Sequence, residues 1–118
     1  MTENLAPSER IRKKKEFLYL YKKGHRYKSK YFSLIYLSNS LAHSRVGVVA
    51  SRKIGGAVAR NRAKRWMREL YRRNKVLLTT PVDLILVALP AINEATWAEL
   101  KECYIQTVGK IFEKQRTR

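Results

Sequence analysis

One short run constrains the fold of this chain more than any other part of the sequence. Residues 82–88, Val-Asp-Leu-Ile-Leu-Val-Ala, are apolar at every position except Asp83 and lie between Pro81 and Pro90. The run is far too short to cross a bilayer. It is typical of a strand buried on both faces, as in a βαβ crossover that joins two parallel strands through a helix. We therefore expect residues 82–88 to pair in parallel with the strand that precedes the previous helix.

The remaining segments predict a single α+β domain with the order α-β-β-α-β-α, a mixed sheet packed by helices and room for one further short strand. A short helix is expected from about Lys14 to Gly24, where glycine ends it. Alternating apolar residues predict strands at 27–37 and 45–51, which we expect to form an antiparallel pair connected through residues 38–44.

Both ends of the domain carry recognisable signals. Thr96 and Glu99 have the spacing of a capping box, which predicts the start of a last helix that closes the core. Residues 1–8 are expected to be a mobile lead, and residues 114–118 are expected to fray. The domain is thus predicted to span residues 1–118 with a folded centre and loose ends.

The helix predicted between the second and third strands, from about Val58 to Asn74, separates apolar from cationic residues. At 100° per residue one stripe holds Ala59, Ala63, Trp66, Met67 and Leu70, and the opposite face holds Asn61, Lys64, Arg65, Arg68 and Arg72. Glu69 is the single acid of the stretch, so the cations need an external polyanion. RNA or DNA is the expected partner.

Charge and composition agree with a folded nucleic-acid-binding protein. The 118 residues carry a net charge of +17, well above the ~2 to 8 that keeps a small domain soluble, yet 45% of them are hydrophobic. The single cysteine, Cys103, excludes an internal disulfide and a multi-cysteine zinc site, and we expect it in the core. No apolar segment suggests secretion or membrane insertion, so a cytoplasmic location is expected.

The chain offers little for protein-based catalysis. Its nine acids are scattered, and its two histidines, His25 and His43, are expected in exposed loops. The Gly55-Gly56 pair lacks the spacing of a nucleotide-binding loop and predicts a tight turn. We therefore predict no catalytic residue, no metal ligand and no organic cofactor, and we disfavour a self-sufficient nuclease.

Two aromatic residues of the first helix have two possible roles. Phe17 and Tyr21 share one face of the helix and are flanked by basic residues. An aromatic stripe is more often part of a core, but this interleaving also suits the stacking of bases, which contributes about 1 to 3 kcal/mol per base.

The sequence resembles the protein subunit of bacterial ribonuclease P. The resemblance rests on Arg45-Val46-Gly47, on residues 51–65, Ser-Arg-Lys-Ile-Gly-Gly-Ala-Val-Ala-Arg-Asn-Arg-Ala-Lys-Arg, and on Arg68-Glu69. Arg60-Asn61-Arg62 with Lys64-Arg65 matches the family's RNR motif, and the terminal segments match in composition only.

This resemblance implies a non-catalytic protein cofactor of an endoribonuclease ribonucleoprotein. Its partners would be the ribonuclease P RNA and precursor tRNA, with no obligate protein partner. The RNA subunit would bind most of the Mg²⁺ and cut the precursor to free the mature 5′ end. The family's fold also implies a left-handed βαβ crossover, against the usual right-handed rule.

The resemblance also implies two sets of site residues. The set facing the catalytic RNA is Lys53, Arg60, Asn61, Arg62, Lys64, Arg65 and Arg68, which Arg72 extends on the charged face of the helix. The set lining the cleft for the 5′ leader is Phe17, Tyr21, Ser33, Ile35 and Ser51. The strand position where the family often has a leader-contacting tyrosine is Ile35 here, and Tyr36 is expected on the opposite face.

A second function class also suits the composition. A small basic ribosomal protein, or another structural RNA-binding protein, would have a similar charge and a mixed α/β form. Co-sedimentation with ribosomes would favour this alternative, whereas association with one RNA of a few hundred nucleotides would favour the ribonuclease P role.

Overall fold

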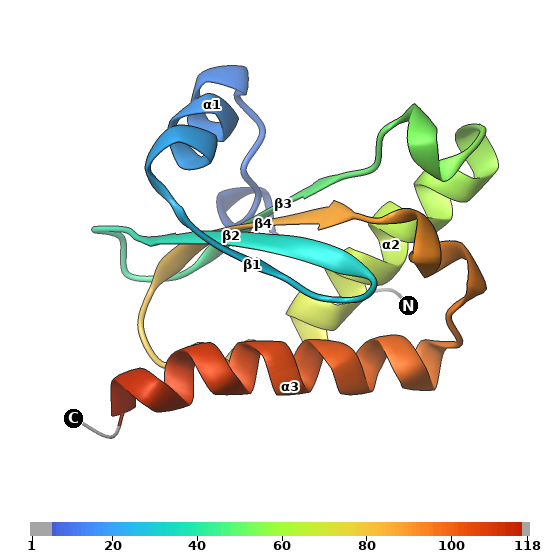
Figure 1. Cartoon of the computed structure of the whole chain (residues 1–118). Coiled ribbons are helices and arrows are strands. Elements are labelled where there is room, and N and C mark those ends of the chain that lie inside the picture. Colours follow the sequence, from blue (N-terminus) through green and yellow to red (C-terminus); the bar gives the residue numbers. More distant parts are fainter. Residues whose placement is uncertain (1–5, 117–118) are drawn as a thin grey trace.

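The computed structural model describes residues 6–116, and the side chains of residues 6–112. Its strands form a four-stranded mixed sheet, and helices cover both faces of this sheet (Figure 1). In chain order they are α1 (Lys14–Lys23), β1 (His25–Lys28), β2 (Phe32–Ser38), β3 (Arg45–Val49), α2 (Ala57–Arg73), β4 (Val82–Ala88) and α3 (Trp97–Arg116). Among the described residues, the 3-10 helix η1 (Pro7–Glu9) precedes α1, and three more, η2 (Arg52–Ile54), η3 (Lys75–Leu77) and η4 (Pro90–Glu94), lie between the later elements. The predicted α+β class and element order are confirmed.

Strand β4 occupies an inner position of the sheet, whose order is β1-β2-β4-β3. It pairs antiparallel with β2 and parallel with β3. Leu84 and Leu86 belong to the larger core, whereas Ile85 belongs to a second core on the other face of the sheet. The predicted strand buried on both faces, parallel to the strand before α2, is confirmed.

The prediction for the first two strands was wrong in two ways. The expected strand at residues 27–37 is a hairpin of β1 and β2, and its turn is held by the Ser29 hydroxyl, which donates to the Phe32 carbonyl at 2.7 Å. Strands β2 and β3 are also not neighbours, because β4 lies between them. A strand that is apolar on both faces gains most from an inner position, so β4 separates two strands that are consecutive in sequence.

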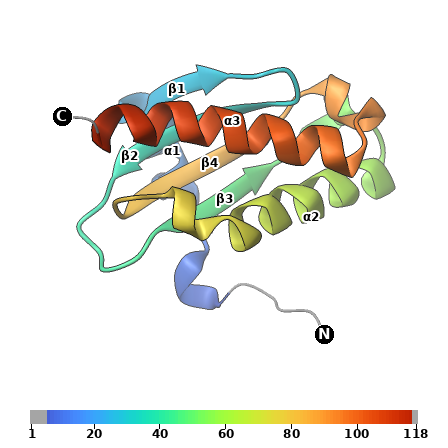
Figure 2. The same ribbon diagram turned by 90° about the horizontal axis from the view of Figure 1, so that it is seen from below.

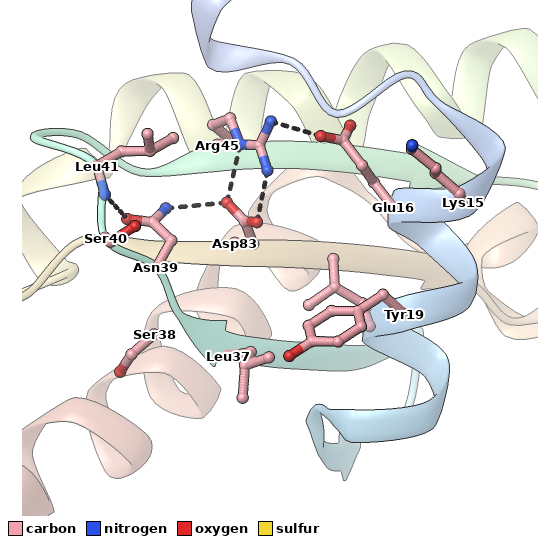
Figure 3. A pocket seen from close by; sticks show the side chains of 11 residues that line it. Lys15, Glu16, Tyr19, Leu37, Ser38, Asn39, Ser40, Leu41, Arg45 and Asp83 are labelled. Carbon is pink, nitrogen blue, oxygen red and sulfur yellow. Dashed lines mark hydrogen bonds and ion pairs between the residues drawn. The ribbon is translucent and has the colours of Figure 1, made fainter.

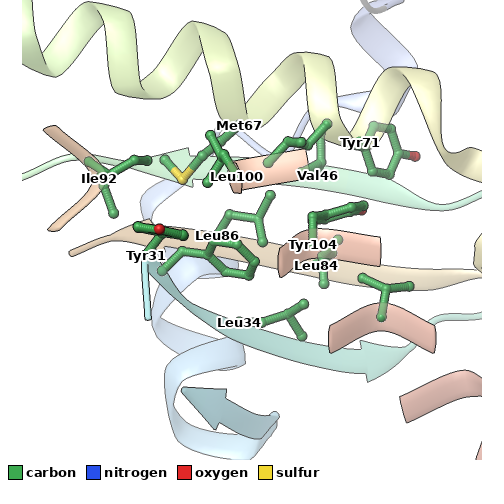
Figure 4. Packing of buried hydrophobic residues seen from close by; sticks show 14 of the residues in the cluster. Tyr31, Leu34, Val46, Met67, Tyr71, Leu84, Leu86, Ile92, Leu100 and Tyr104 are labelled. Carbon is green, nitrogen blue, oxygen red and sulfur yellow. The ribbon is translucent and has the colours of Figure 1, made fainter. Parts of the chain in front are cut away.

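Helices α2 and α3 cover one face of the sheet, and α1 covers the other (Figures 1 and 2). The larger core includes Met67 and Leu70 of α2, Leu100 and Tyr104 of α3, and the facing residues of the sheet (Figure 4). In Figure 2, seen from the side of α2 and α3, the chain leaves β3 and passes through α2 on the near face before it enters β4. With these two parallel strands turned to point upward in this view, β4 lies to the left of β3, so the crossover is left-handed.

The predicted capping box is present at the start of α3. The Glu99 N–H donates to the Thr96 hydroxyl at 3.1 Å, and the Thr96 N–H donates to the Glu99 carboxylate at 3.0 Å. Helix α3 continues to Arg116, beyond the predicted start of fraying. Residues 1–5 of the predicted mobile lead and residues 117–118 lie outside the described residues, so mobility there stays a prediction.

Two residue placements differ from the sequence-based predictions. His25 is the first residue of β1 rather than a loop residue, and its ring lies 5.1 Å from that of Tyr36. Cys103 is half-buried and packs against the outside of the larger core rather than within it. His43 lies in an exposed loop as expected.

Candidate RNA-binding surfaces

The segment entering α2 is fixed by a turn that glycine permits. Gly55 has a φ of 139°, a conformation that residues with a Cβ rarely adopt. Ile54 before it is 3% exposed, and its carbonyl accepts a hydrogen bond from the Asn93 amide at 2.7 Å. These contacts fix the direction in which α2 starts, and they leave Lys53 exposed beside it.

The predicted division of α2 into an apolar and a cationic side is present. Ala63, Met67, Leu70 and Tyr71 are buried against the sheet and α3. Of the predicted RNA-facing residues, Asn61, Arg62 and Arg65 are exposed, and Arg60, Lys64, Arg68 and Arg72 are half-buried. Together with Lys53 they form a basic surface that runs along α2 and its approach; we call these eight residues the α2 surface.

The end of the α2 surface is partly neutralised within the helix itself. The Glu69 carboxylate accepts hydrogen bonds from Arg72 at 2.9 and 3.0 Å and from Arg73 at 2.8 Å. The bonds from Arg72 lower the pKa of Glu69, and those from Arg73 add to the effect. The positive charge therefore concentrates toward the N-terminal half of α2.

An aromatic contact supports the start of the α2 surface. The Arg62 guanidinium lies 4.3 Å from the ring centre of Trp66, which meets Trp97 of α3 edge to face at 5.8 Å. Trp66 is half-buried rather than fully buried. Stacking of this kind orders an arginine without neutralising its charge, so Arg62 stays available to a phosphate.

A second candidate surface lies on the α1 face of the sheet, beside that helix. The Phe17 ring rests on the backbone of β3, where a Cβ at Gly47 would meet its Cζ atom at 2.7 Å. Phe17 and Tyr21 are both half-buried at the edge of the smaller core. Each thus packs on one side and leaves part of its ring open.

Strand pairing extends this second surface across the sheet. Lys28 pairs with Ser33, Ser33 with Val87 and Val87 with Val49, so these four residues form one row across four strands. Lys28 is exposed and the other three are half-buried. Phe17, Tyr21 and this row form a surface patch beside α1, which we call the α1 cleft after the leader-binding cleft that the family resemblance implies. Ser51 is exposed just beyond the end of β3.

The structure corrects the expected role of Ile35. This side chain is 1% exposed and packs with Leu20 and Ile85 beneath α1. It therefore forms the floor under the helix and offers no surface to a ligand. Tyr36 packs against the ring of Phe112 on the opposite face, as the strand alternation predicted. Tyr36 therefore does not replace, on the α1 face of the sheet, the tyrosine that the family often has at the position of Ile35.

An ion-pair network fixes α1 to the sheet (Figure 3). Arg45 of β3 donates to Asp83 at 2.7 and 2.9 Å and to Glu16 of α1 at 3.1 Å. Asn39 also donates to Asp83, at 2.9 Å. The bonds to Asp83 raise the pKa of Arg45. Because Glu16 precedes Phe17, this network sets the position of the aromatic pair over the sheet.

Among the residues that the structure describes, no group of three or more His, Cys, Asp or Glu side chains is placed to hold a metal ion. None of the described helices is long and apolar enough to span a membrane. The described residues instead provide the α2 surface, which suits a polyanion, and the α1 cleft, which suits a stacked base.

This fold and these surfaces define a small RNA-binding protein of the α+β class. Residues 5–112 match the family model for ribonuclease P, and the chain belongs to that family.

Similar proteins cover most of the chain. The ribonuclease P protein component of Thermotoga maritima is 37% identical over 94 residues, which are 80% of each chain. The solved RNase P protein of the same organism has a TM-score of 0.79 at 30% identity, covering 86% of this chain and 96% of that one. The RNase P protein of Staphylococcus aureus has a TM-score of 0.77 at 32% identity, covering 87% and 94%. These similarities favour a ribonuclease P subunit over a ribosomal protein.

Proposed function

We propose that this chain is the protein subunit of a ribonuclease P that matures the 5′ end of tRNA. In this role the α2 surface holds the ribonuclease P RNA, and the α1 cleft holds the single-stranded 5′ leader of precursor tRNA. The family membership supports a partner RNA and participation in an endoribonuclease complex. A cytoplasmic location suits both RNA partners.

The observation that carries the proposal is the difference between the two surfaces. The α2 surface is cationic along a helix, which suits the phosphates of a large folded RNA. The α1 cleft combines two half-buried aromatic rings with a row of one exposed lysine, one serine and two valines. This combination suits a flexible strand whose bases can stack. Because the sheet lies between α1 and α2, the two RNAs can be bound at the same time.

We assign the cleavage chemistry to the RNA subunit. The described residues provide no group of three or more His, Cys, Asp or Glu side chains that could hold Mg²⁺. Magnesium bound by the RNA would supply an activated water and stabilise the leaving oxygen. The protein contributes binding and orientation: its cations lower the repulsion between the two RNAs, and its cleft fixes the leader beside the cleavage site.

Reconstitution with the ribonuclease P RNA of the same organism tests this function. Purified protein should increase the cleavage of precursor tRNA most strongly at low Mg²⁺, where cations on the protein replace screening by the metal. The protein alone should not cut. A protein with no effect on cleavage at any magnesium or salt concentration would refute the proposal, and cleavage by protein alone would establish a nuclease instead.

A further inference from the structure

Residues 10–11, which precede α1, are hydrogen-bonded to the outer edge of β3. The Ile11 N–H donates to the Val46 carbonyl at 2.9 Å, and Arg10 forms a parallel bridge with Val46. The Ile11 side chain is 4% exposed within the smaller core. Arg10 is therefore held by its backbone next to the sheet, on the side where α2 packs against β3.

Arg10 is half-buried at this position, and one donor of its guanidinium has no partner within the described part of the chain. Its Nε is buried and has no hydrogen-bond partner among the residues that the structure describes. A buried N–H without an acceptor destabilises the protein, and more strongly when the group is charged. Such a donor marks a position where an acceptor from outside the chain would be stabilised.

A second arginine, Arg68, follows Met67 on α2, and Met67 shares the larger core with Val46, the bridge partner of Arg10. Arg68 is half-buried on α2, and burial together with the nearby charge of Arg10 lowers its pKa. Two like charges beside one another are unfavourable in the free protein. The arrangement becomes favourable once an anion lies between them.

The neighbouring acids are engaged elsewhere. Glu9 accepts hydrogen bonds from Lys75 at 2.8 and 3.0 Å, and Glu69 accepts them from Arg72 and Arg73. Among the described residues, no hydrogen bond or ion pair joins Arg10 or Arg68 to a carboxylate. The pair therefore has cationic donors and no internal anion.

We propose that Arg10 and Arg68 together bind one phosphate group of the RNA backbone, at the junction of the N-terminal segment and α2. Guanidinium groups match phosphate oxygens with two parallel N–H donors, and a shared phosphate would also satisfy the buried Nε of Arg10. The identity of the RNA rests on the proposed function; the phosphate site itself rests on these two side chains. It would extend the α2 surface to the edge of β3.

A double-mutant cycle on binding to the ribonuclease P RNA tests whether the two residues share one phosphate. Arg10→Gln and Arg68→Gln should each weaken binding about tenfold, and the double variant should be weakened by well under the hundredfold product. Arg12→Gln is the matched control, because exposed Arg12 lies two residues away in the same segment. Arg12→Gln should weaken binding less than Arg10→Gln does, and in the double variant with Arg68→Gln the two losses of affinity should multiply.

A measurement without RNA separates this site from the proposed function. Sulfate should raise the melting temperature of the wild-type protein more than chloride does at equal ionic strength. Arg10→Gln should reduce this difference and Arg12→Gln should keep it, because the general stabilisation by sulfate is the same in every variant. Arg10→Lys keeps the charge but loses the paired donors, so it should also reduce the difference between the effects of sulfate and chloride. This variant replaces Arg10→Gln in the test if Arg10→Gln does not fold.

The two measurements have distinct contrary outcomes. Fully multiplicative effects of Arg10→Gln and Arg68→Gln, or a sulfate response equal in all variants, would overturn the shared site. A wild-type protein that responds to sulfate but does not bind ribonuclease P RNA would retain the phosphate site and refute the proposed RNA partner.

Discussion

Phe17 is the residue whose double role the structure clarifies. Its ring packs on Gly47 and leaves one side open, so both the core and the base-stacking interpretations apply to parts of the same ring. Phe17→Ala should weaken the binding of precursor tRNA to the reconstituted enzyme about tenfold and leave mature tRNA unchanged, because one stack is lost. Leu18→Ala, at the neighbouring position that is 55% exposed, is the control. Equal losses for both tRNAs would assign Phe17 to the core alone.

Gly47 offers a test in which the aromatic ring is kept. A Cβ at this position would lie 2.7 and 2.9 Å from the Phe17 ring, so Gly47→Ala should displace the ring. We expect a loss of about 1 to 3 kcal/mol in unfolding free energy and weaker discrimination between precursor and mature tRNA. Gly109→Ala in α3, where a Cβ meets nothing within 4 Å, should stabilise by up to ~1 kcal/mol. Unchanged discrimination in Gly47→Ala would show that the ring position is unimportant.

Single residues also show where sequence reasoning reached its limit. The cationic side of α2 follows from helical periodicity, which needs no tertiary information. The burial of Ile35 depends on where α1 lies over the sheet, and the spacing of residues 25–37 does not encode it. The proximity of Arg10 to Arg68 joins residues 58 positions apart, and it arises because the segment of Arg10 and helix α2 both pack on β3.

Helix α1 is attached to the sheet by the Arg45 network. Arg45→Met should lower the unfolding free energy by about 2 to 3 kcal/mol, because Glu16 loses its partner and Asp83 keeps only the hydrogen bond from Asn39, while both carboxylates remain largely buried. The more exposed Lys75–Glu9 pair supplies the control, since Lys75→Met should cost under ~1 kcal/mol. Urea denaturation measures both, and equal losses would contradict a special role for the network.

The C-terminal part of α2 carries a pH-dependent contribution. Glu69 has a folded pKa below its ordinary value of about 4.5, chiefly because Arg72 donates to it. A lowered folded pKa stabilises the protein above the unfolded value, and this gain disappears as the pH falls through the folded value. Wild type should therefore exceed Glu69→Gln in stability at pH 6 to 7, and the gap should close toward pH 3. A constant gap in urea denaturation would contradict this.

Element identity was easier to predict from sequence than strand pairing. The bounds of α2, the start of α3 and the double burial of β4 follow from local spacing and capping chemistry. The β1–β2 turn was missed because Ser29 and Lys30 interrupt the apolar alternation without the glycine or asparagine that usually marks a hairpin. The placement of β4 between β2 and β3 follows from long-range burial rather than from neighbours in sequence.

Across the whole molecule, the sheet separates the two surfaces to which we assign RNA contacts. A net charge of +17 would attract any polyanion, and charge alone gives no specificity. The α2 surface and the α1 cleft lie on elements that cover opposite faces of the sheet (Figures 1 and 2). One small domain can therefore join a large RNA to the flexible end of its substrate.

The affinity of the reconstituted enzyme for precursor tRNAs of increasing leader length tests this account most directly. With the protein present, affinity should rise as the leader grows from none to about ten nucleotides and then level off once the α1 cleft is filled. The RNA subunit alone, at a magnesium concentration that supports its activity, should show a much weaker dependence. An affinity gain from the protein that is equal for every leader length, including none, would contradict the assignment of the α1 cleft to the leader.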